Sequence, residues 1–246
     1  MTDIVFLHGA NHGSWCWAPL LEELRKPPAF QGGLITLDMP GCGTKRGRSV
    51  ADLTVQAIAR ELNDDVRAAS ADHPVLVGHS IAGVLLPAMV LQDPSLYSAV
   101  IHLASLAPAE GSTVLQTHGH SRRGENPDEI GNIADPATTP MDTLFRMLFC
   151  PDLNEAQAEW LLREIMQDTT PPALMTEPVT RSGYEKLGIR TGYILAGRDP
   201  VVPPDWQRRF AARHGASTVI EIDTPHEPFA SHPALLAETL RALIHH

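Results

Sequence analysis

The stretch that decides the fold is VLVGHSIAGVLLPAMV, residues 75–90. A run of β-branched residues and leucine leads directly into GHSIAG, and an apolar helical pattern follows. A serine between small residues, where a strand gives way to a helix, is typical of a nucleophile elbow. The glycines alone are equally compatible with a tight turn between strand and helix. Residues elsewhere in the chain therefore have to distinguish these two interpretations of Ser80.

Short apolar runs of strand length recur along the chain, and helical patterns separate them. Strands are predicted at residues 4–7, 34–37, 74–77, 99–103, 193–196 and 218–222. Helices are predicted at residues 19–25, 50–69 and 234–243 and directly after residue 82, with Ser49 as the N-cap of the second helix. Apolar strands that alternate with helices predict a mainly parallel sheet covered on both faces.

Residues 108–190 interrupt this alternation. The segment is rich in proline, threonine, glycine and acidic residues, and its apolar pieces at 144–149 and 156–166 have helical spacing. An insertion of this kind between two core strands predicts a helical lid, and a disordered loop is the alternative. We therefore predict one α/β domain overall, with a core of residues 1–107 and 191–246 and a lid of residues 108–190.

The composition excludes several classes of partner. The net charge of −10 argues against nucleic acid or an anionic membrane surface as the main partner, because both require a basic footprint. No apolar run is long enough to span a bilayer, and the first residues lack the pattern of a signal peptide. Three cysteines without metal-binding spacing predict reduced thiols in the cytoplasm, with no metal and no cofactor.

Two later loops supply partners for Ser80. Asp199 directly follows the fifth predicted strand, and His226 follows the sixth. Serine becomes a nucleophile when a histidine takes its proton, and the histidine needs a carboxylate on its other nitrogen. The order Ser, Asp, His is that of hydrolase triads on parallel α/β sheets. Asp205 and Asp223 compete for the acidic role, although Asp223 is expected to shape the loop before His226.

An oxyanion hole needs two backbone N–H donors beside the nucleophile. The residue after the serine, Ile81, is one candidate, and Ala10 in the loop at residues 8–13 is the other. His12 in the same loop either lines the pocket or orders the loop. Apolar residues of the insertion either form a hydrophobic substrate pocket or simply pack on the core; the pocket candidates are Phe145, Phe149 and Trp160.

Five segments together resemble the α/β-hydrolase superfamily, and within it the plant methylesterase and hydroxynitrile lyase family with its bacterial esterase relatives. They are FLHGANHGSWCW, LDMPGCG, VLVGHSIAG, AGRDPVVP and DTPHEPFASHP. The resemblance implies an α/β-hydrolase fold with a helical lid. It also implies Ser80 as nucleophile, His226 as base, Asp199 as acid, and the amides of Ala10 and Ile81 as the oxyanion hole.

The resemblance also favours one branch of that family. The lyase branch places threonine where this chain has Gly9, and lysine where it has Glu227. We therefore expect a serine hydrolase that acts on a small-molecule substrate and cleaves hydrophobic or aromatic carboxylic esters, methyl or alkyl, through an acyl-enzyme, with a homodimer as an open option. A hydroxynitrile lyase-like activity and a non-catalytic binding protein of the same fold are the alternatives.

Overall fold

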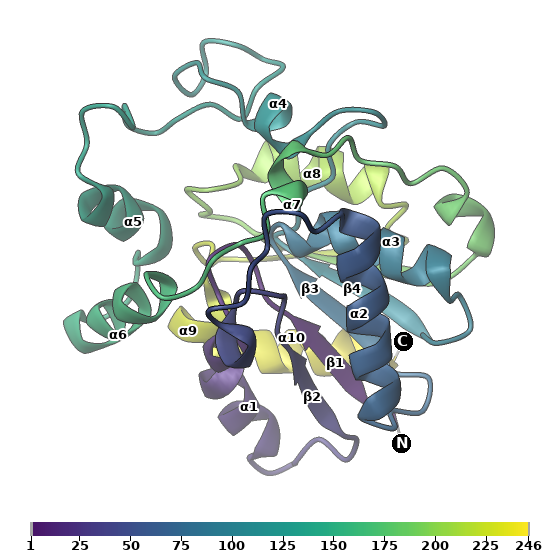
Figure 1. The fold of residues 1–246 in the computed structure, drawn as a ribbon. Helices are drawn as coiled ribbons and strands as arrows, with labels where there is room; N and C mark the ends of the chain where they lie inside the picture. The colour runs from purple at the N-terminus through teal and green to yellow at the C-terminus, as the bar shows by residue number, and fades with distance from the viewer. Residues whose placement is uncertain (1, 246) are drawn as a thin grey trace.

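Six parallel strands form the centre of the structure, a computed structural model that describes residues 2–245 (Figure 1). Their order in the sheet is β2-β1-β3-β4-β5-β6. The bounds are β1 (Ile4–Leu7), β2 (Leu34–Leu37), β3 (Val75–His79), β4 (Ala99–Leu103), β5 (Arg190–Ala196) and β6 (Thr218–Ile222). All pairings are parallel, so the carboxyl ends of the strands meet at one edge of the sheet.

Helices cover both faces of this sheet, as the apolar strands predict. Successive side chains of β1 contribute to two separate cores: Val5 and Leu7 to one, Ile4 and Phe6 to the other. The first core includes residues of α2 (Val55–Ala68), α3 (Ala82–Gln92) and α8 (Pro204–Arg213). The second includes residues of α1 (Ala18–Arg25), α9 (Pro228–Ser231) and α10 (Pro233–His245). The predicted α/β-hydrolase architecture is thereby confirmed.

The insertion lies between β4 and β5, and its named elements are short helices separated by loops. It contains α4 (Val114–His118), α5 (Met141–Phe149), α6 (Glu155–Ile165), α7 (Ala173–Thr176) and the 3-10 helix η3 (Tyr184–Leu187). In Figure 1, α5 and α6 stand to one side of the sheet, whereas α4 and α7 lie near α8. Two further 3-10 helices, η1 (Ser14–Trp17) and η2 (Gly43–Lys45), follow β1 and β2. A lid function for the insertion stays a prediction.

Several predicted elements begin at other residues than expected, and the largest difference, five positions, is in one helix. The helix predicted at 50–69 starts at Val55, because the Thr54 hydroxyl caps it by accepting a hydrogen bond from the Ala57 amide. Ser49 is therefore not its N-cap. The helix after the elbow runs from Ala82 to Gln92 with Pro87 inside it. Within residues 2–245, no helix is long and apolar enough to cross a membrane.

Candidate active site

Ser80 occupies a sharp turn between β3 and α3, where its φ of 54° lies in the left-handed region that serine rarely adopts. The small neighbours are required by close packing. A Cβ on Gly78 would collide with the Leu86 side chain, and one on Gly83 would collide with the Leu106 carbonyl. Ala82, by contrast, accommodates its methyl group in the last position of the elbow motif. The turn therefore has the strained geometry of a nucleophile elbow.

Hydrogen bonds connect Ser80, His226 and Asp199 in one chain. The Ser80 Oγ lies 3.1 Å from His226 Nε2, and His226 Nδ1 lies 2.6 Å from Asp199 Oδ2. All three residues are buried, with 7%, 1% and 4% of their surface exposed. The strand ends thus bring together residues that lie 119 and 27 positions apart in the sequence.

Asp199 is fixed by donors on both of its oxygens. Its Oδ1 accepts hydrogen bonds from the amides of Val201 and Val202, at 2.7 and 2.9 Å. Its Oδ2 accepts one from the Gln207 side chain at 3.0 Å as well as facing His226. With hydrogen-bond partners on both oxygens, the Asp199 carboxylate is fixed in place and holds the His226 imidazole in the tautomer that has its hydrogen on Nδ1.

The competing aspartates lie elsewhere. Asp223 is exposed and forms an ion pair with Arg198, and Asp205 is exposed and pairs with Arg208. The structure brings only Asp199 of the three aspartates to His226.

The charge of Asp199 also affects the pKa of His226. Burial lowers the pKa of His226, but the charge of Asp199 and its hydrogen bond outweigh burial, so the pKa is raised above its ordinary 6.5. His79, beside the nucleophile, donates from Nε2 to the His226 carbonyl at 2.9 Å. Burial lowers the pKa of His79 well below 6.5. His79 thus positions the loop of the base as a neutral side chain.

The loop after β1 approaches Ser80 from the other side. Ala10 and Ile81 both line the cavity around Ser80, and in the part of the chain that the structure describes no backbone acceptor takes their amide hydrogens. Asn11 adopts a left-handed φ of 55° and is held by Thr170 of the insertion. The Asn11 amide donates to Thr170 Oγ1 at 2.7 Å, and that hydroxyl donates to Asn11 Oδ1 at 2.8 Å. The insertion thus fixes the backbone next to Ala10.

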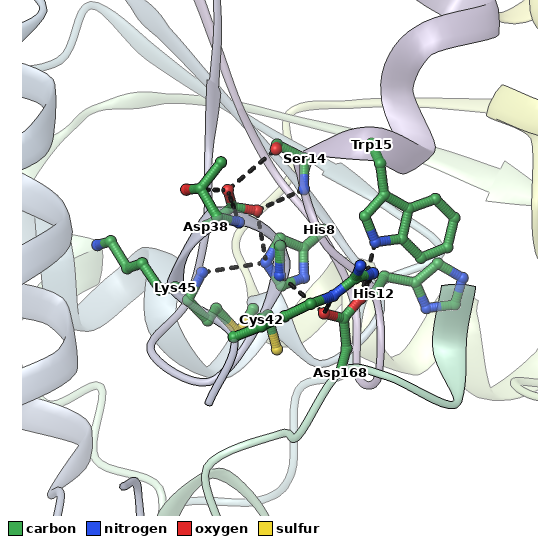
Figure 2. Close-up of polar contacts among 12 residues, drawn as sticks. His8, His12, Ser14, Trp15, Asp38, Cys42, Lys45 and Asp168 are labelled. Atoms are coloured by element: carbon green, nitrogen blue, oxygen red, sulfur yellow. Dashed lines mark hydrogen bonds and ion pairs between the residues drawn. The ribbon is translucent and has the colours of Figure 1, made fainter. Parts of the chain in front are cut away.

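Two carboxylates, Asp38 and Asp168, bind the residues that directly follow this loop, as Figure 2 shows. Asp38, after β2, accepts hydrogen bonds from the amide and hydroxyl of Ser14. Asp168, after α6, accepts one from the Trp15 indole at 2.7 Å and forms an ion pair with Arg46 at 2.6 Å. Burial opposes ionisation of both carboxylates, but these donors outweigh it and hold both pKa values below the ordinary range. Core and insertion are therefore tied together beside the loop.

The cavity above Ser80 is mainly apolar. Of the predicted pocket residues, His12 and Phe149 line it. Phe145 and Trp160 do not. Phe145 packs against the lining residue Phe149, whereas Trp160 packs edge-on against Trp15, which in turn stacks on the lining residue His12. Residues that the sequence reasoning missed complete the lining: Leu106, Val114, His118, Ile130, Met175, Val201, Val202 and Glu227.

Some of these missed lining residues could have been predicted from their positions in the sequence, and others could not. Val201 and Val202 follow Asp199 directly, and Glu227 follows His226, so adjacency to the triad was an available signal. Val114, Ile130 and Met175 come from the insertion, whose path the sequence pattern does not define.

Within residues 2–245, three side chains bring potential metal-ligating atoms within 4.8 Å of one another: His79, His226 and Glu227. Both ring nitrogens of His226 already face Ser80 and Asp199, and His79 Nε2 faces a carbonyl. A cation there would have to displace the hydrogen bonds of the triad. His226 therefore cannot ligate a cation while its hydrogen bonds to Ser80 and Asp199 are intact.

Known proteins resemble this chain in sequence or in fold. The chain is 27% identical over 260 residues to methylesterase 9 of Arabidopsis thaliana, covering 98% of this chain and 97% of that protein. It is 34% identical to a probable esterase of Oryza sativa subsp. indica, PIR7A, over 125 residues, which span about half of each chain (50% and 46%). An extracellular α/β-hydrolase from a Paenibacillus species has the same fold, with a TM-score of 0.77, 19% identity and 99% of each chain covered.

A family model described as "Alpha/beta hydrolase family" matches residues 4–239, which include the whole sheet, the elbow and the three hydrogen-bonded residues. This match extends over nearly the entire chain. The protein therefore belongs to the alpha/beta hydrolase family.

Proposed function

We propose that this protein is a serine hydrolase that cleaves carboxylic esters through an acyl-enzyme. The observation that carries the proposal is the buried hydrogen-bonded chain from Ser80 through His226 to Asp199, which opens onto an apolar cavity. Relatives named as an esterase and a methylesterase support the same reaction class. The relatives named as methylesterases favour a small-molecule ester as the substrate.

Each residue then has a defined step. The Ser80 Oγ attacks the ester carbonyl while His226 Nε2 takes its proton, and Asp199 stabilises the resulting imidazolium. The tetrahedral oxyanion accepts hydrogen bonds from the amides of Ala10 and Ile81. His226 then protonates the leaving alkoxide and afterwards activates the water that hydrolyses the acyl-enzyme.

The cavity wall favours a hydrophobic acyl or alcohol group. Side chains of the insertion form much of this wall, including Val114, Ile130, Phe149 and Met175. In this proposal the insertion acts as the lid over the bound ester. The cytoplasmic location and the homodimer remain predictions.

The alternatives receive less support. A threonine at Gly9, as in the lyase branch, would place its Cβ 2.8 Å from His79 Nδ1, so the residues around the elbow would have to move. The place of the lyase lysine is taken by a buried carboxyl group, Glu227. A binding protein without chemistry would have no need of the complete Ser80, His226 and Asp199 chain.

The test is turnover of p-nitrophenyl acetate and p-nitrophenyl butyrate by Ser80→Ala. We expect kcat to fall by at least about 10⁴-fold with an unchanged fold, because the nucleophile is absent. Ser95→Ala, at an exposed serine, is the matched control and should keep wild-type turnover. Retention of more than a tenth of the activity in Ser80→Ala would overturn the proposal.

A further inference from the structure

Glu227 is a buried acid without a partner. Only 1% of its surface is exposed, and neither carboxyl oxygen has a hydrogen-bond partner within the described chain. It lines the same cavity as Ser80 and directly follows His226. A buried carboxyl group that makes no hydrogen bond destabilises the folded state, so its presence calls for a role outside folding.

Imidazole nitrogens of two side chains outside the triad lie near Glu227: His12 Nε2 is 3.6 Å from its Oε1, and a ring nitrogen of His79 lies within 4.8 Å of its carboxyl group. The other ring nitrogen of His12, Nδ1, lies 2.7 Å from the Ala10 carbonyl and must carry a hydrogen to bond it. Burial lowers the pKa of His12 to about 4, so the ring is neutral at pH 7. His12 Nε2 therefore presents a lone pair, and among residues 2–245 this atom also has no hydrogen-bond partner.

The protonation state of Glu227 follows from its surroundings. Burial raises its pKa to about 8, so at pH 7 the carboxylic acid form predominates. An acid hydrogen and an imidazole lone pair then lie close together, yet 3.6 Å is too long for a direct hydrogen bond between them. The cavity thus offers one donor and one acceptor side by side in a mainly apolar wall.

A hydroxyl group complements this pair. It accepts a hydrogen bond from the Glu227 acid and donates one to His12 Nε2, whereas an ether or a carbonyl group makes only the first bond. An ammonium group would require Glu227 to ionise in an apolar wall. The pair adjoins both the base His226 and Ala10, so the hydroxyl lies within a few bonds of the scissile carbonyl.

We propose that His12 and Glu227 form a polar subsite that selects esters carrying a hydroxyl group close to the scissile ester bond. The proposal rests on ester hydrolysis at Ser80 and defines the substrate class of that reaction. Glu227 is in this view a specificity-determining residue, because its contact with the substrate discriminates between esters that share the same reacting group.

The test compares matched esters. Ethyl 2-hydroxyhexanoate and ethyl 3-hydroxyhexanoate place the hydroxyl on the acyl chain, and 2-hydroxyethyl hexanoate places it on the alcohol. Each is measured against its methyl ether and against the parent ester, ethyl hexanoate. We expect at least one hydroxy ester to exceed its ether and ethyl hexanoate in kcat/KM by tenfold or more, because the ether leaves the His12 acceptor unpaired.

Two variants assign the preference to Glu227. Glu227→Gln keeps a neutral donor and should retain the preference within about threefold, whereas Glu227→Leu should reduce the ratio to near one. The ratio is taken within each variant, so a general loss of rate cancels. Glu227→Leu should also unfold at an equal or higher temperature than the wild type, because an unpartnered buried polar group is removed.

The outcomes separate this proposal from the proposed function. If the wild type hydrolyses none of these esters and no p-nitrophenyl ester, the proposed function fails. If it hydrolyses them without preferring any hydroxy ester, or with a preference that survives Glu227→Leu, only the subsite is overturned. A large fall in the unfolding temperature of Glu227→Leu would show a structural role and would also overturn it.

Discussion

Asp199→Asn exchanges a carboxylate oxygen for an amide nitrogen at a site where every acceptor position is used. The asparagine oxygen should stay on the Oδ1 side, because two backbone amides, those of Val201 and Val202, donate to that position. The new NH₂ group then takes the place of Oδ2, which lies 2.6 Å from His226 Nδ1. Gln207 loses one acceptor but keeps the carbonyls of Ala196 and Val202.

The consequence is the wrong tautomer of the base. An NH₂ group donates to His226 Nδ1, so the ring hydrogen moves to Nε2 and points at the Ser80 Oγ 3.1 Å away. The histidine can then no longer take the serine proton, and the negative charge that stabilises the imidazolium is gone. Loss of this function in a Ser-His-Asp triad lowers kcat by about 10⁴-fold, or about 5 kcal/mol in activation free energy.

The assay is kcat for p-nitrophenyl butyrate at pH 8, with urea unfolding as the check of the fold. The unfolding free energy should change by only about 1 kcal/mol, because Gln207 keeps two acceptors. Asp223→Asn and Asp205→Asn are matched controls at the exposed aspartates and should stay within twofold of wild type. More than a tenth of the activity in Asp199→Asn, or an equal loss in a control, would refute the reasoning.

Three further predictions follow from the same contacts. Asp199 raises the pKa of His226 above 6.5, so kcat/KM should fall about tenfold per pH unit as the pH drops below that pKa; an acid limb with its midpoint well under 6.5 would contradict this. Burial lowers the pKa of His214 to about 3, so this residue takes up a proton more readily in the unfolded chain than in the folded one. The unfolding free energy should therefore be at its full value above pH 6.5 and should fall as the pH drops below 6.5. At pH 5 this amounts to about 2 kcal/mol, and urea unfolding of His214→Gln at pH 7 and pH 5 should show a correspondingly smaller loss than wild type; an equal loss would exclude His214 as the cause. Asp168→Ala leaves the Trp15 indole and the Gly43 amide without their acceptor, so unfolding free energy should fall by about 2–4 kcal/mol and kcat should fall with it; an unchanged unfolding midpoint would disprove the support of the loop by Asp168.

The sheet and the triad were predictable from the sequence because each depends on local pattern and chain order. Apolar runs of strand length mark β1 to β6, and the elbow, Asp199 and His226 each come at the end of a strand. Parallel strands bring such ends to one edge whatever the length of the intervening chain. Chain order alone did not identify the acid, because Asp223 also directly follows a strand, β6. The structure pairs Asp223 with Arg198 and places Asp199 against His226.

The cavity wall and the supports of the loop were not predictable, because they depend on contacts across more than a hundred residues. Thr170 holds Asn11 over 159 positions, and Asp168 holds Trp15 over 153. The aromatic residues of α5 and α6 have helical spacing that is the same whether they line a cavity or pack behind it, so Phe149 could not be separated from Trp160. The only notable feature of Glu227 in the sequence was that it occupies the position where the lyase branch has a lysine.

The central claim is that the elbow serine is an activated nucleophile, and covalent labelling tests it most directly. Incubation with a fluorophosphonate probe, followed by peptide mass spectrometry, should locate one adduct on Ser80. The adduct should be absent from Ser80→Ala and should form far more slowly in His226→Ala, because the serine then lacks its base. An intact Ser80 after prolonged incubation, or a label on another residue that persists in Ser80→Ala, would contradict the account.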